Sequence, residues 1–228
     1  MSGIKDWNVS KVKEFNNMFE GCSSLQNLDV LKDWKISEDC KISDFGYSLN
    51  FSNMFDGCSS LQNLDGLKDW KFSIASNFSN MFKGCSSLQN LDGLQNWKFR
   101  YQPNCSYMFK GCISLKNLSA LKEWKEISKV KGMFEGCSSL QNLDGLQDWK
   151  VSGDYSYMFK GCFSLKNLSG LKECKEISHV EGMFEGCSSL QNLDGIQDWI
   201  FKKGFYYKLK FNFSNMLKGC SSLQNLDE

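Results

Sequence analysis

The chain has 228 residues, of which 41% are hydrophobic, 23% charged and 14% aromatic, as in a typical folded protein. Its net charge of +1 argues against nucleic acid as a partner, because nucleic-acid-binding proteins carry a clustered basic surface. No run of about 18 apolar residues is present, so the sequence predicts no membrane insertion.

The chain begins and ends inside a repeated unit. Residues 3–7 match residues 66–70, and the last residue, Glu228, comes two positions after Leu226. Neither end has the polar capping unit that normally closes a repeat stack, and residues 1–7 lack the basic and apolar parts of a secretory signal. We therefore expect residues 1–228 to be a single repeat domain, and a segment of a longer array.

The sequence motif MFKGCSSLQNLD, at residues 81–92, recurs with small changes along the whole chain. Self-similarity with a period of 20 to 50 residues is typical of a solenoid, in which each unit buries its apolar side against its neighbours. We number the repeats 1 to 8 by their cysteines: Cys22, Cys58, Cys85, Cys112, Cys137, Cys162, Cys187 and Cys220.

Each repeat has one part of constant length and one part of variable length. The repeat cysteine and the following tryptophan are 12 residues apart, as from Cys85 to Trp97, whereas the tryptophan and the next methionine are 9 to 20 residues apart. In repeat 6, Cys174 replaces the tryptophan. Insertions are therefore absorbed after the tryptophan, and the segment from cysteine to tryptophan, here called the Cys-to-Trp arm, is the fixed part.

The apolar spacing predicts one short strand and one short helical turn in each repeat. Leu88, Leu91 and Leu94 resemble a leucine-rich-repeat strand, with the third leucine just past its end. Residues 77–85 are expected to form a helical or 3₁₀ turn that buries their apolar residues and ends at Gly84. The predicted fold is an α/β leucine-rich-repeat solenoid of about eight coils, with short parallel strands on one face and short helical or 3₁₀ turns on the other.

These motifs resemble the BspA-like leucine-rich-repeat proteins, most closely the branch found in Mycoplasma, gut bacteria and protists, over roughly Trp7 to Leu226. The departures are Cys174, Leu217 in place of phenylalanine, and long insertions in two repeats. The resemblance implies a cell-surface or secreted protein in adhesion, with host or matrix proteins as partners and no catalytic residues. An intracellular protein-interaction scaffold is the alternative, and an enzyme is disfavoured.

Two groups of residues are the predicted binding sites. The residue after the first leucine of the arm should be exposed in every repeat, and the insertion of the last repeat mixes lysine with aromatic residues. The competing interpretations are that the row only keeps the protein soluble and that the insertion is only a solvated loop. The residues are Gln62, Gln89, Lys116, Gln141, Lys166 and Gln191 in the row, and Lys202, Tyr206 and Lys208 in the insertion.

Eleven cysteines and one histidine, His179, raise the question of disulfides or metal. There is no Cys-x-x-Cys pair, and stacked repeat cysteines would point in parallel, which opposes disulfide geometry. We favour buried, reduced thiols; disulfides involving Cys40, Cys105 or Cys174 come second and metal third. No catalytic group, metal site or cofactor is predicted.

Asparagine precedes the second leucine of every repeat, as at Asn90. We favour an amide ladder between repeats over a solvent-facing row, because buried amides need partners. The sequence contains seven Asn-x-Ser sequons. Because they arise from the repeated motif itself, they argue only weakly for glycosylation. The tryptophans are expected to form a spine in the core.

Overall fold

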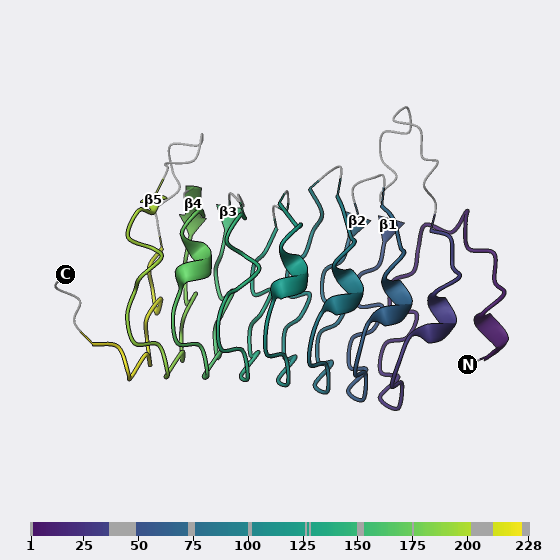
Figure 1. Cartoon of the computed structure of the whole chain (residues 1–228), viewed down its shortest axis with the longest axis horizontal. Coiled ribbons are helices and arrows are strands. Elements are labelled where there is room, and N and C mark those ends of the chain that lie inside the picture. Colours follow the sequence, from purple (N-terminus) through teal and green to yellow (C-terminus); the bar gives the residue numbers. More distant parts are fainter. Residues whose placement is uncertain are drawn as a thin grey trace.

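The repeats stack side by side in the computed structural model, so that the chain progresses from one end of an elongated body to the other (Figure 1). The structure describes residues 2–36, 49–72, 76–99, 102–125, 127, 129–149, 153–174, 176–201 and 212–224. Cys40 and three of the predicted binding residues, Lys202, Tyr206 and Lys208, lie outside these ranges.

Short parallel strands come just before the Met-Phe dipeptide of a repeat or follow its tryptophan, near one edge of the stack (Figure 1). β1 pairs with β2, and β3, β4 and β5 form a second sheet in that order. Isolated bridges from Asn77 to Asn104 and from Asn104 to Lys129 continue the pairing between the two sheets. The strands are β1 (Leu49–Asn50), β2 (Ser76–Asn77), β3 (Gly153–Asp154), β4 (Glu176–His179) and β5 (Ile200–Phe201).

A row of 3₁₀ helices runs along one face of the stack (Figure 1). Apart from η1, each ends at the third leucine of a Cys-to-Trp arm, where Leu94 N–H donates to the Leu91 carbonyl at 2.8 Å. The helices are η1 (Ser2–Ile4), η2 (Asp29–Leu31), η3 (Asp65–Leu67), η4 (Asp92–Leu94), η5 (Ser119–Leu121) and η6 (Ser169–Leu171).

The predicted types of element are present, but their places within the repeat are exchanged. The leucines at 88 and 91 belong to no strand, and the arm turns into η4 instead. The physical reason is local: Asn90 Oδ1 accepts the Asp92 N–H at 3.1 Å, which bends the chain where a strand would continue.

Residues 77–85, predicted as a helical turn, form successive β-turns. Asn80 and Gly84 have φ of 57° and 71°, a region that asparagine and glycine tolerate at the third position of a turn. Because the turns keep the backbone open, alternate N–H groups reach the next repeat: Phe78 N–H donates to Asn104 O at 2.8 Å, and Phe82 N–H to Met108 O at 2.9 Å. These bonds satisfy the backbone across the stack.

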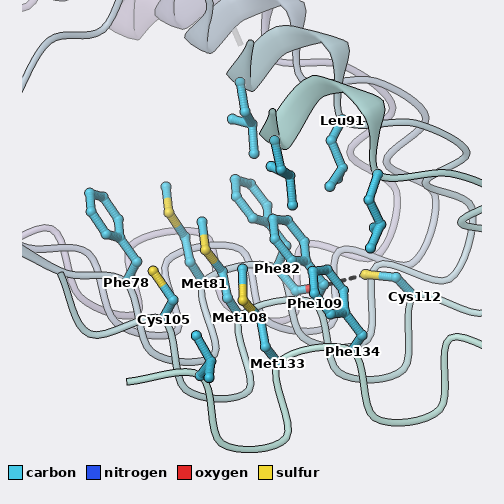
Figure 2. Close-up of a cluster of buried hydrophobic side chains, with 14 of the residues drawn as sticks. Phe78, Met81, Phe82, Leu91, Cys105, Met108, Phe109, Cys112, Met133 and Phe134 are labelled. Carbon is cyan, nitrogen blue, oxygen red and sulfur yellow. Dashed lines mark hydrogen bonds between the residues drawn. The ribbon is translucent and has the colours of Figure 1, made fainter. Parts of the chain in front are cut away.

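The core is a set of ladders in which equivalent side chains stack from repeat to repeat. Phe82, Phe109 and Phe134 lie nearly parallel with ring centroids 5.7 Å apart, beside a row of methionines (Figure 2). The tryptophans from Trp34 to Trp199 are at most 9% exposed, which confirms the predicted spine. Each indole N–H donates to a leucine or isoleucine carbonyl of the preceding repeat, as from Trp97 to Leu67 at 2.9 Å.

Candidate binding surface

The Gln/Lys row, defined as Gln62, Gln89, Lys116, Gln141, Lys166 and Gln191, is exposed at all six positions. The flanking leucines are buried in the core, apart from the partly buried Leu193, so the row residue between them points outward. Backbone bonds between repeats set the spacing of the row: Lys116 N–H donates to Gln89 O and Lys166 N–H to Gln141 O, both at 3.2 Å. The row is thus held on a regular backbone, and its role in binding stays a prediction.

Two apolar side chains lie on the same arms and were missed in the sequence analysis. Ile113 and Phe163 are 49% and 55% exposed, although their neighbours Cys112 and Cys162 are fully buried. Both replace the first serine of the repeat's Cys-Ser-Ser, and each comes three residues before a lysine of the row. Their departure from the serine of the repeated motif was the sequence signal that could have identified these two residues.

A hollow of about 630 Å³ opens at the tryptophan end of the arms in repeats 2 to 4. Its lining is mostly charged or amide side chains around the edge of a buried indole, so it offers a polar recess. The lining residues are Lys68, Asp69, Trp70, Lys71, Phe72, Gln95, Asn96, Lys98 and Glu123.

A different row, at the residue before the repeat glycine, carries ion pairs between repeats. Lys83 Nζ lies 2.9 Å from Asp56 Oδ2, and Lys160 Nζ lies 2.9 Å from Glu185 Oε2. The bond to Lys160 holds the pKa of Glu185 below its ordinary value. Tyr157, whose hydroxyl bonds the Glu181 carboxylate, has its pKa raised to about 12 chiefly by that bond. These charges are paired within the stack and serve its register.

Six of the eight repeat cysteines, from Cys58 to Cys187, are buried and act as hydrogen-bond donors, whereas Cys220 is half-buried and Cys22 is exposed. Cys112 Sγ donates to Phe82 O at 3.2 Å (Figure 2), and the same bond recurs from Cys58 to Cys220. Burial raises the pKa of Cys58 to about 12, so the thiol keeps its proton at neutral pH. This geometry matches the favoured interpretation of buried thiols, and such thiols are poor nucleophiles.

The asparagine ladder is real but involves other asparagines than predicted. Asn104 Nδ2 donates to Asn77 Oδ1 at 3.1 Å, and Asn77 Nδ2 to Asn50 Oδ1 at 3.5 Å. The predicted ladder residues, such as Asn90, instead accept an N–H two positions along their own repeat. The sequon asparagines Asn50 and Asn77 likewise accept their own serine N–H at 3.1 Å, so the Asn-x-Ser motif has a structural use.

In the part of the chain that the structure describes, no three His, Cys, Asp or Glu side chains are grouped as metal ligands. The ring of His179 contacts its neighbour Ser178 at 2.9 Å on β4. No helix among the described residues is long and apolar enough to cross a membrane.

Comparisons with known proteins agree with this architecture. The family model described as "Mycoplasma protein of unknown function, DUF285" matches residues 1–124 and 44–149, and the model of the BspA type leucine rich repeat region matches residues 102–227 in six copies. No curated protein and no solved structure matches the chain. Together the two models extend over nearly the whole sequence, and the chain belongs to the BspA-type leucine-rich-repeat family.

Proposed function

We propose that this chain is a non-enzymatic solenoid of about eight coils, one domain over residues 1–228, that binds proteins in adhesion at the cell surface. The observation that carries the proposal is the Gln/Lys row, whose side chains are exposed at the same position of six repeats. At about 4.8 Å per repeat the row spans roughly 24 Å, enough for a protein interface of standard size. Leucine-rich repeats generally serve as interaction modules, which agrees with this role.

Adhesion is tested with beads that carry the chain and are applied to cultured epithelial cells. The double variant Gln62→Ala/Gln89→Ala should retain about a tenth or less of the bound beads, because two contacts worth about 0.7 kcal/mol each give a tenfold loss. Lys35→Ala/Lys125→Ala, at exposed positions after the tryptophans, is the matched control and should bind as the wild type does. Wild-type beads that do not adhere, or a row variant that adheres equally well, would contradict the proposal.

A second candidate function, an intracellular scaffold, is favoured by the thiol ladder. Seven repeat cysteines donate a hydrogen bond through Sγ, which requires the reduced form. The intact mass of natively produced protein, alkylated under denaturing, non-reducing conditions, distinguishes an intracellular scaffold from an exported adhesion protein. Eleven alkylated thiols and no added sugar mass would support the scaffold, and cysteines missing in pairs or added sugar would support export.

A further inference from the structure

The charge on the Cys-to-Trp arms alternates between repeats 4 and 7. Repeats 4 and 6 each carry two lysines and one glutamate, a net charge of +1, while repeats 5 and 7 each carry two aspartates, a net charge of −2. All ten side chains are exposed: Lys116, Lys122 and Glu123; Asp144 and Asp148; Lys166, Lys172 and Glu173; Asp194 and Asp198. The arms thus form four stripes of alternating sign, about 4.8 Å apart.

Two further features follow the same alternation. The exposed Ile113 and Phe163 stand only on the positive stripes, where the other repeats have serine. The backbone alternates too, because repeats 4 and 6 contain η5 and η6 whereas repeats 5 and 7 turn through Gly145 and Gly195 at φ of 105° and 107°. The stripes therefore differ in charge, apolar surface and shape.

We infer that this striped surface is the interface of an antiparallel homodimer. The twofold axis lies in the interface, runs perpendicular to the long axis of the stack and passes between repeats 5 and 6. It reverses the order of the stripes in the second copy. Repeat 4 then faces repeat 7 and repeat 5 faces repeat 6, so every positive stripe opposes a negative one. A parallel arrangement would place each stripe opposite its own kind, which costs free energy.

The charges also select the register of the dimer. Repeats 1, 2 and 3 each have a net charge of −1 on this arm, so the positive stripes occur only at repeats 4 and 6. Sliding one copy by one repeat places like charges of repeats 4 to 7 opposite each other, because repeat 4 then faces repeat 6 or repeat 5 faces repeat 7. In the matched register repeats 5 and 6 flank the axis, and Phe163 lies beside its counterpart in the second copy. Burial of an exposed phenylalanine adds an apolar centre to the charged interface.

Four stripes cover roughly 19 Å along the stack, so this is a small, electrostatic interface that weakens with salt. It covers the row from Lys116 to Gln191, and beyond these positions repeat 3 faces repeat 8, so of the row only Gln62 stays clear of the second copy. The inference goes beyond the proposed adhesion and does not depend on it, because dimerisation is measured on the chain alone, without cells.

Sedimentation equilibrium of the whole chain tests the inference with a charge swap. At about 0.1 M salt the wild type should reach twice the 26.1 kDa chain mass, and dissociate at about 1 M. Lys116→Glu/Lys166→Glu makes all four stripes negative and should weaken the dimer about tenfold or more. Asp144→Lys/Asp194→Lys removes the strongly negative stripes and should weaken it similarly. An equimolar mixture of the two variants should dimerise again.

The controls distinguish an interface from misfolding. Lys32→Glu/Lys68→Glu changes the same face in repeats 1 and 2 and should remain dimeric, and Phe163→Ser restores the usual repeat residue and should weaken association in a folded chain. Far-UV circular dichroism checks the fold of each variant. A monomer at every concentration, or swap variants that fail to dimerise when mixed, would overturn the inference and leave the stripes to a different protein partner.

Discussion

Replacement of Trp97 by alanine measures how much one rung of the tryptophan spine stabilises the stack. The indole is fully buried, stacks on Trp124 at a centroid distance of 5.9 Å and meets Phe72 at 4.7 Å. Loss of a buried tryptophan costs about 3 to 5 kcal/mol from transfer and cavity terms. The lost bond to Leu67 O adds little, because that carbonyl still accepts the Trp70 N–H at 3.1 Å.

The assay is urea unfolding followed by far-UV circular dichroism, with the slope checked for two-state behaviour because repeat stacks can lose cooperativity. Trp97→Phe should cost about 2 kcal/mol, since it keeps the ring contacts and loses the hydrogen bond and part of the volume. The matched control is Trp7→Ala, at the equivalent position of the incomplete unit before repeat 1 but 51% exposed, which should cost about 1 kcal/mol or less. A loss below about 1 kcal/mol for Trp97→Ala would refute the spine.

Two further predictions concern the cysteines. The pKa of Cys58 is raised to about 12 in the folded chain, so above pH 9 the unfolded chain loses a proton that the folded chain keeps. The free energy of unfolding therefore falls as pH rises from about 9 towards 12, with a slope that approaches about 1.4 kcal/mol per pH unit once the unfolded thiol is ionised. Cys174→Trp should cost about 1 to 3 kcal/mol by overpacking, because the buried Tyr155 hydroxyl already contacts the Cys174 thiol. Adding Tyr155→Val to the same chain should recover at least about 1 kcal/mol, because the pair then matches Val130 and Trp149 of the preceding repeat.

Both predictions are checked by urea midpoints. For the first, unfolding at pH 7, 9 and 10 is compared with Cys58→Ala, whose free energy of unfolding should fall by about 1 kcal/mol less between pH 9 and pH 10. Equal falls would show that the thiol does not contribute. For the second, a double-mutant cycle over Tyr155 and Cys174 supplies the coupling. Strict additivity would mean that the two side chains do not share a space.

The side chains that are buried could be predicted from the sequence, because every repeat places the same side chains on the same side. The spacing that marked Leu88, Leu91 and Trp97 as core also holds in the structure, and the outward position of Gln89 follows from the buried leucines around it. Apolar residues that recur in register must be buried whatever the backbone between them does, since no repeat can hide its apolar side alone.

The backbone path and the surface pattern were decided by the tertiary structure. The side chain of Asn90 turned a predicted strand into a 3₁₀ helix, and the positive φ of Asn80 opened a predicted helical turn so that its N–H groups face the next repeat. The replacement of the repeat serine by Phe163 was visible in the sequence, but the exposure of the ring was established by the stack. Hydrophobic burial depends on composition and spacing along the chain, whereas hydrogen-bond partners and neighbouring charges depend on which repeats come together in space.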